Sequence, residues 1–397
     1  MKEKICCVVQ RYGLEVNGGA ELHCRQLAER LVPFYDVEVL TTKAIDYMTW
    51  KDEYKQSEEM IHGVKVRRFS VSKERNIAEF NQINDKFMQG NLAQKDEQKW
   101  MDAQGPYVPE LIQYISKHKD DYKVFIFFTY LYYQTAMGIR VVKEKSIVVP
   151  DAHDEPFLKM KIFDPVFKSP KAMLFNTEDE CMLVRKKYKN WDVKYRIGGA
   201  GVDLPNDING QRFKDKYKLD KYMVYVGRID EGKNCSQLFR DFITYKKLYP
   251  SNLKLILMGK SVIQIPQHPD IISLGFVDDQ DKFDGICGSD FLVLPSKFES
   301  LSIVVLEAFS LGIPVLVNGV CDVLKSHCTK SNAGLYYKRP AEFCEAVQFL
   351  EEHPDVREAM GVLGKAYVEQ YYQWDVVIKK FCELIDFVIQ SNEFKER

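Results

Sequence analysis

Two glutamates in the segment "KFESLSIVVLEAFSLGIPVLVNG" (residues 297–319) are candidates for binding a ligand. Glu299 lies in a polar stretch, whereas Glu307 interrupts the apolar run "IVVLEAF", where a leucine would bury better. The pattern predicts a helix with its N-cap at Ser302 and its end at Gly312, and a helix N-terminus suits phosphate because its N–H groups are free. The two carboxylates could then meet one ligand at different depths. In the alternative, Glu307 pairs with a nearby lysine or arginine and Glu299 is a solvated charge. The spacing alone is a weak signal, and for an arbitrary pair of glutamates it favours this alternative.

A cationic cluster follows the strand-like run in "VYVGRIDEGKN". Gly227 ends that run and allows a ligand to approach the backbone closely. Arg228 offers a planar fork of donors and Lys233 a point charge, and both suit a diphosphate. Asp230 and Glu231 could instead neutralise these cations in a solvated loop. Taken alone, the two interpretations are evenly matched.

A glycine pair lies early in the chain, in "EVNGGAE". Gly18 and Gly19 precede a predicted helix and follow the first predicted strand, as in a phosphate-binding turn. The spaced third glycine of a dinucleotide fingerprint is missing here and in "GGAGVDL". A nicotinamide cofactor is therefore not expected.

A histidine follows another predicted strand, in "VVPDAHDEPF". His153 could contact a ligand from the first half of the chain, although a lone histidine is more often a structural hydrogen-bonding group. Asp151, Asp154 and Glu155 could be metal ligands. One acidic cluster without a second set of ligands argues only weakly for a metal ion.

Strands and helices must position these residues. Short apolar runs alternate with helical patterns, which is typical of parallel sheets covered on both faces, and the alternation starts again after residue 220. We expect two doubly wound halves joined by the polar, glycine-bearing stretch 198–211. Ligands of such sheets bind beyond the carboxyl ends of the strands, where the loops described above lie. The expected strands are 4–10, 36–42, 122–130, 146–153, 172–177, 222–228, 253–259, 271–276, 291–296 and 313–319, and the expected helices include 20–32, 235–248, 340–353 and 374–390.

Composition excludes several classes of protein. The 397 residues include 56 basic and 57 acidic side chains, so nothing in the overall charge argues for a nucleic-acid partner. The ten cysteines form no Cys-x-x-Cys pair and suggest buried thiols in a reducing cytosol. The N-terminal apolar run is too short for a signal peptide, and no run approaches the roughly 20 residues of a membrane span. We expect a cytoplasmic protein and leave open a peripheral contact with the inner face of the membrane.

Taken together, these motifs resemble those of the retaining glycosyltransferases of glycosyltransferase family 4. The segments "VGRIDEGKN", "LMGK", "LGFV" and "ESLSIVVLEAFSLGIPVL" occur in the family order, and "GGAE", "HDEP", "NTEDE" and "GAGVD" extend the resemblance through the first half. It implies the α/β architecture called GT-B, in which two Rossmann-like doubly wound domains face a central cleft and a C-terminal helix crosses back to the N-terminal domain. The expected domains are 1–205 with the crossover helix 375–397 on the acceptor side, and 206–374 for the nucleotide-sugar donor.

The resemblance also implies roles for individual residues. Glu299 would lie against the donor sugar, and Glu307 would bind the ribose hydroxyls. Arg228 and Lys233 would bind the diphosphate, and His153 would contact the donor sugar. Other residues that the resemblance places at the nucleotide sugar are Gly18, Gly19, Gly227, Gly275, Phe276, Leu301 and Ser302.

Two features depart from the commonest family pattern. Asn234 stands where many members have a glycine after the lysine. The polar stretch 73–105 has no equivalent in the shorter members, and it reads as a helical or irregular excursion from the first half. We expect this excursion to shape the acceptor site.

The implied activity is transfer of a hexose or deoxyhexose from a nucleoside-diphosphate sugar, with retention of configuration. The acceptor would be a glycan, a glycolipid or a glycoprotein, in the synthesis of bacterial surface polysaccharide or another glycoconjugate. No metal or other cofactor is expected, because cationic side chains and a helix N-terminus would neutralise the leaving group. Two alternatives remain: a nucleotide-sugar epimerase on the same fold, and a non-catalytic subunit of a glycosylation complex.

Overall fold

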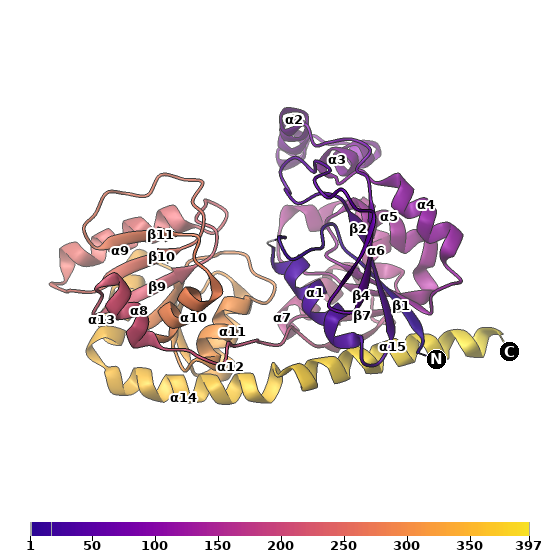
Figure 1. Ribbon diagram of the computed structural model, residues 1–397. Coiled ribbons are helices and arrows are strands. Elements are labelled where there is room, and N and C mark those ends of the chain that lie inside the picture. Colours follow the sequence, from indigo (N-terminus) through magenta and orange to yellow (C-terminus); the bar gives the residue numbers. More distant parts are fainter. Residues whose placement is uncertain (1, 17, 397) are drawn as a thin grey trace. The chain divides into compact units, whose positions relative to one another are not determined.

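The computed structural model describes residues 2–16 and 18–396, and its chain forms two compact α/β units (Figure 1). The first unit comprises Met1–Ala200 and Asp375–Arg397, and the second comprises Gly201–Trp374. The chain thus leaves the first unit after Ala200, within the expected linker, rather than after residue 205. Each unit contains a largely parallel sheet with helices around it, which confirms the predicted pair of doubly wound domains.

The sheet of the first unit has the strand order β3-β4-β2-β1-β5-β6-β7-β8 and is parallel except for β3. Its central strands are buried along their length, as the continuous apolar runs predict. The strands are β1 (Lys4–Val8), β2 (Asp36–Thr42), β3 (Glu58–Ile61), β4 (Val64–Phe69), β5 (Val124–Phe128), β6 (Ser146–Val149), β7 (Ala172–Phe175) and β8 (Lys194–Ile197). The α-helices are α1 (Gly19–Leu31), α2 (Ile77–Met88), α3 (Glu97–Gln104), α4 (Pro109–His118), α5 (Tyr133–Val142), α6 (Asp164–Lys168), α7 (Glu178–Tyr188) and α15 (Trp374–Glu396).

The sheet of the second unit has the order β11-β10-β9-β12-β13-β14, and all its pairs are parallel. The strands are β9 (Tyr222–Val226), β10 (Lys254–Met258), β11 (Ile271–Gly275), β12 (Phe291–Leu294), β13 (Val315–Asn318) and β14 (Gly334–Tyr337). The helices are α8 (Gly210–Tyr217), α9 (Cys235–Leu248), α10 (Asp279–Cys287), α11 (Ile303–Ser310), α12 (Asp322–Ser331), α13 (Pro340–Glu352) and α14 (Pro354–Tyr371).

The expected strands are all present; β2 has the expected bounds, and the others are shorter by one to a few residues. Strands β3, β4, β8 and β14 were not expected, because charged or glycine-bearing sequences such as "KYRI" and "GLYY" lack a continuous apolar run. The antiparallel pair β3 and β4 is joined by His62 and Gly63, which both adopt positive φ angles as a tight hairpin turn requires.

The excursion 73–105 forms α2 and α3 with a short 3₁₀ turn between them, so its expected helical character is confirmed. It packs on the segment that follows His153. The ring of Phe87 stacks on Phe157 with centroids 5.5 Å apart, and Trp100 lies 5.1 Å from the same ring. Glu97 Oε2 accepts a bond of 2.7 Å from the Ile162 amide.

No helix among the described residues is long and apolar enough to cross a membrane.

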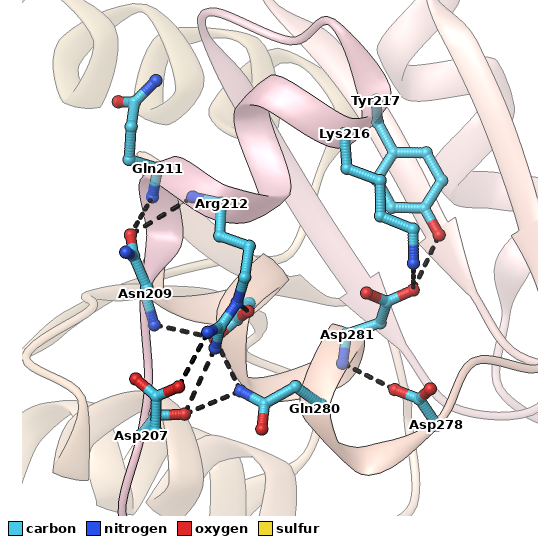
Figure 2. A network of polar contacts seen from close by, with 10 residues as sticks. Asp207, Asn209, Gln211, Arg212, Lys216, Tyr217, Asp278, Gln280 and Asp281 are labelled. Carbon is cyan, nitrogen blue, oxygen red and sulfur yellow. Dashed lines mark hydrogen bonds and ion pairs between the residues drawn. The ribbon is translucent and has the colours of Figure 1, made fainter.

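A polar network fixes α8, the first helix of the second unit, against α10 (Figure 2). Arg212 donates to both oxygens of the Asp284 carboxylate, over 2.5 and 3.0 Å. The Asn209 amide and the Gln280 side chain donate to the same carboxylate. One turn further along, Lys216 and Tyr217 both point to Asp281, as the figure shows.

We expect this network to make the second unit sensitive to acid. Burial by itself would raise the pKa of Asp284, but the bonds from Arg212, Asn209 and Gln280 outweigh burial and lower it. A lowered folded pKa means that the stabilisation is complete above the unfolded value of about 3.9 and is lost as the pH falls through the folded value. The Asp284→Asn variant should therefore melt at a lower temperature at neutral pH and lose less stability than the native chain below about pH 4.

The measurement is a set of thermal melts from neutral pH to pH 3, with the exposed Asp220→Asn as the matched control. An Asp284→Asn protein with the same acid profile as the native chain would contradict this role.

Candidate active site

The second unit places its charged loops at one point of the sheet. The order of the strands in the sheet changes direction at β9. Strands β10 and β11 lie on one side of β9, and β12, β13 and β14 lie on the other. The gap between β9 and β12 is therefore the topological switch point, where ligands of open α/β sheets bind beyond the carboxyl ends. The loop after β9 carries Arg228 and Lys233, and the loop after β12 carries Glu299.

An ion pair joins these two loops. Lys233 Nζ lies 2.6 Å from Glu299 Oε1, and the two side chains retain 31% and 13% of their exposure. Asp230 Oδ1 accepts a bond of 2.8 Å from the Lys233 backbone amide. Asp230 Oδ2 also lies 3.1 Å from Arg228 Nε. The expected cations and the first glutamate are thus brought together, and Asp230 orients both cationic residues.

Asn234 contributes a bond that a glycine could not make. It is the N-cap of α9 with φ 60° and ψ 29°, in the left-handed region that asparagine tolerates better than most residues. Its side-chain Nδ2 donates to the Pro295 carbonyl over 3.2 Å, which ties the loop after β9 to the end of β12. Asn234 therefore adopts a conformation that a glycine also adopts readily, and it adds a contact at the switch point.

The second glutamate, Glu307, has a cationic partner that the sequence analysis did not identify. Glu307 lies in α11 and is 8% exposed, and its Oε1 is 2.9 Å from Lys282 Nζ of α10. Glu307 thus pairs with a nearby cation, as the alternative interpretation of this residue expected. Lys282 follows a predicted strand in "LGFVDDQDK", and this position was the available signal for finding it.

The N-terminus of α11 differs from the expected cap. Ser302 occupies the N-cap position, but it adopts φ 65° and its side chain makes no capping bond. Its buried hydroxyl has no hydrogen-bond partner among the described residues. The Leu301 carbonyl accepts a bond of 2.8 Å from His327 Nε2, so a histidine that was not singled out fixes the turn before the helix. Gly312 follows the helix with φ 75°, as a helix end requires.

Glycines allow the ends of β9, β10 and β11 to approach one another. Gly227, Gly259 and Gly275 all have positive φ angles. A Cβ on Gly259 would lie 1.9 Å from the Gly227 carbonyl oxygen, so only a glycine fits there. Next to Gly275, the side chain of Phe276 is 75% exposed, and it is the one large ring that follows this strand directly.

In the first unit, Gly18 and Gly19 precede α1. A Cβ on Gly18 would lie 2.1 Å from Glu21 Oε2, whereas one on Gly19 would meet nothing within 4 Å. Glu21 in turn binds Arg11, with Nη2 2.7 Å from Oε1, and both side chains are 7% exposed. The need for a glycine at position 18 thus follows from this buried pair, and Asn17 of the same loop lies outside the described residues.

His153 lies in the loop after β6 and keeps 31% of its side-chain exposure. Its Nε2 is 3.3 Å from Glu155 Oε2, and the Tyr130 hydroxyl donates to Glu155 Oε1. Glu155 is thereby held between a tyrosine at the end of β5 and the histidine. The arrangement orients the His153 ring while leaving part of it exposed.

Two carboxyls beside this loop are buried. Burial raises the pKa of Asp151 to about 7, and Asn176 Nδ2 donates to its Oδ1 over 2.7 Å. Burial also raises the pKa of Glu180, which accepts bonds of 2.6 Å from the amides of Ala152 and Asn176. Glu180 therefore links the loops after β6 and β7. No group of three or more histidine, cysteine, aspartate or glutamate side chains suited to a metal ion occurs in the described part of the chain.

A family model and a relative matched over nearly its full length are similar to this chain. Residues 220–353 match the model for glycosyl transferases group 1. An uncharacterized glycosyltransferase of Methanocaldococcus jannaschii is 24% identical over 415 residues, which cover 95% of this chain and 96% of that protein.

Two solved structures share the fold. Sucrose-phosphate synthase from Thermosynechococcus elongatus matches with a TM-score of 0.74 and 14% identity over 98% of this chain and 100% of its own. Anabaena HepE in complex with UDP-glucose matches with a TM-score of 0.68 and 13% identity over 96% and 99%. These findings confirm the GT-B fold and support a glycosyltransferase.

The Lys282–Glu307 pair gives a testable prediction about stability. Replacing Lys282 by methionine keeps a long, unbranched side chain but leaves the buried carboxylate of Glu307 without its cation. This should lower the free energy of unfolding by about 1–3 kcal/mol. Urea denaturation of the native chain, Lys282→Met, Glu307→Gln and the double variant measures the coupling.

The double variant should lose less unfolding free energy than the two single variants lose together, because each single change leaves the other side chain without its partner. Strictly additive costs would show that the two side chains do not stabilise each other.

Proposed function

Starting from a glycosyltransferase with the GT-B fold, we propose that this chain is a retaining enzyme of glycosyltransferase family 4. It takes a hexose or deoxyhexose from a nucleoside-diphosphate sugar and transfers it to a glycan, glycolipid or glycoprotein. The setting we propose is the synthesis of bacterial surface polysaccharide or a related glycoconjugate.

The observation that carries this proposal is the Lys233–Glu299 contact of 2.6 Å at the switch point of the second unit. It holds a cation suited to phosphate and a carboxylate suited to sugar hydroxyls in adjacent loops. Arg228 lies in the same loop as Lys233, with its side chain 52% exposed and so available to a ligand. The loops are shaped by the left-handed backbone of Asn234 and by the close approach of Gly259 to the Gly227 carbonyl. A pair of solvated surface charges would require neither feature.

The leaving group of the proposed reaction is a nucleoside diphosphate. As the bond between the sugar C1 and the phosphate oxygen breaks, negative charge grows on the phosphate. Lys233, Arg228 and the free N–H groups at the start of α11 would stabilise that charge by electrostatics that exist before the reaction. These groups take the place of a divalent cation, so we propose that no metal is required.

Retention of configuration requires attack on the face from which the phosphate departs. The acceptor oxygen would form its bond to C1 while the C1–phosphate bond breaks, and the acceptor proton would pass to a departing phosphate oxygen. Glu299 and His153 would bind hydroxyls of the donor sugar, and Glu307 would bind the ribose. Glu155, which contacts His153 over 3.3 Å, would keep the imidazole oriented.

The base of the nucleotide is open to direct test. HepE was crystallised with UDP-glucose, which supports uridine diphosphate as the first nucleotide to try. Phe276 and the backbone at Gly275 are the groups that we propose lie near the base.

We expect Lys233→Ala to lower the rate of donor turnover by about ten- to a hundredfold. A charge-assisted bond to phosphate contributes roughly 1.5–3 kcal/mol, and each 1.36 kcal/mol corresponds to a factor of ten. The assay is release of nucleoside diphosphate from a panel of nucleotide sugars, chosen by thermal shift with the free diphosphates. A ligand at 100 times its dissociation constant stabilises the fold by about 2.7 kcal/mol, which is readily measured.

The matched control is Lys221→Ala, an exposed lysine before the amino end of β9 and thus at the opposite edge of the sheet. Activity of Lys233→Ala within twofold of the native chain would remove Lys233 from the site. A parallel arm with EDTA should leave turnover unchanged, and loss that manganese or magnesium restores would refute the metal-free mechanism. Conversion of the donor sugar without release of diphosphate would indicate an epimerase instead.

A further inference from the structure

A basic and aromatic surface lies at the outer edge of the sheet of the first unit, where β8 is the last strand. In "RKKYKNWDVKYR" (185–196), six of the twelve residues are lysine or arginine and one is acidic, although the whole chain has a net charge of -1. We call the exposed basic and aromatic residues of this segment the β8 edge patch: Lys186, Lys187, Lys189, Trp191, Lys194 and Tyr195. The exposed Asp192 is the acidic residue of the segment, and it also lines the groove described below.

The lysines of the β8 edge patch outnumber the one carboxylate of the segment, Asp192. None of its four lysines forms an ion pair with a carboxylate of the described residues. The neighbouring Arg196 does pair, with Glu383 of α15 at 3.0 Å. The patch therefore presents several ammonium groups that have no carboxylate partner among the described residues.

The two aromatic rings of the patch are held in exposed positions. Trp191 is 53% exposed and Tyr195 is 37% exposed. The guanidinium of Arg185 lies 4.9 Å from the Trp191 ring and 4.3 Å from the Tyr195 ring, and it also donates to the Trp191 carbonyl over 3.0 Å. Arg185 thus contacts both rings, and each ring remains partly exposed.

A groove lies beside these rings. It has a volume of about 520 Å³ and is lined by residues 191–197 together with Phe387 of α15. The ammonium groups of Lys171 and Lys194 lie 5.6 and 5.7 Å from the Phe387 ring. An apolar floor with cations around it suits a molecule that has both an apolar chain and a negative head group.

Protection of a sheet edge explains only part of this composition. Lysines on an edge strand prevent pairing with another strand, and Lys194 serves that purpose. Lys186, Lys187 and Lys189 lie off the strand, and an exposed tryptophan such as Trp191 is not among the features that protect a sheet edge. Lysines next to tryptophan and tyrosine are the composition of surfaces that bind the head-group region of a bilayer.

We propose that the β8 edge patch docks the first unit on an anionic phospholipid bilayer. The lysines attract the negative surface, the rings enter the boundary between head groups and acyl chains, and the groove accepts part of one lipid. This surface lies outside the donor site, so the proposal does not depend on the proposed transferase activity.

The test is co-sedimentation of the full chain with vesicles of phosphatidylcholine alone and with about a third of phosphatidylglycerol. The native chain should bind the anionic vesicles, and binding should weaken as salt is raised. Lys186→Gln/Lys187→Gln/Lys189→Gln should weaken binding roughly a hundredfold, because each lysine near an anionic surface contributes about a fivefold factor. Trp191→Ala/Tyr195→Ser should also weaken binding, including at high salt.

The matched control removes the same charge from the second unit, as Lys218→Gln/Lys221→Gln/Lys247→Gln, and should bind as the native chain does. Lys233→Ala should also bind normally, which separates this proposal from the donor site. Failure of the native chain to bind anionic vesicles, or equal loss in the control, would overturn the proposal. The proposal would also be overturned if the patch lysines were needed to bind single-stranded RNA and the native chain did not bind vesicles.

Discussion

The ion pair between Lys233 and Glu299 is the contact on which the candidate site depends. It joins the loops after β9 and β12, the two strands between which the sheet of the second unit changes direction. Because neither side chain is fully buried, the pair forms without a large desolvation cost and can exchange partners when a ligand arrives. A diphosphate would attract the lysine, and the glutamate would then be free to accept bonds from a sugar. In the proposed site, the pair thus holds both side chains in adjacent loops until the ligand separates them.

The surrounding structure gives this pair its position. Glycines at the ends of β9 and β10 bring two loops into backbone contact, and Asn234 bonds to the last residue before the loop that carries Glu299. Glu307 lies deeper and is held by Lys282 at 2.9 Å. Glu299 is thus paired with Lys233, a cation that a phosphate could attract. Glu307 is paired with Lys282, which lies on a different helix, α10. This difference is the physical basis for giving the two glutamates different roles.

Much of this organisation could be predicted from the sequence because continuous apolar runs report buried parallel strands directly. All strands except β3, β4, β8 and β14, and the loops that carry the candidate residues, follow from such runs. Charged β8 could not be found so, because it is an edge strand whose side chains face solvent. The partner of Glu307 was harder to find: the place of Lys282 after a predicted strand puts it near the site, but nothing in the spacing says that α10 and α11 bring the two side chains together. The cap at Ser302 was expected from residue type, but its left-handed backbone depends on the loop before it and on the bond from His327 to Leu301.

Calorimetric titration of the glutamate variants tests the division of roles most directly. If Glu307 binds the ribose, Glu307→Gln should weaken binding of the free nucleoside diphosphate and of the donor alike. If Glu299 acts at the sugar, Glu299→Gln should leave free diphosphate binding nearly normal while transfer slows, because a contact made in the transition state lowers kcat. Melting curves on the same samples separate binding from stability. A Glu307→Gln protein that melts far lower yet binds the nucleotide normally would contradict the assignment and leave Glu307 as the structural partner of Lys282.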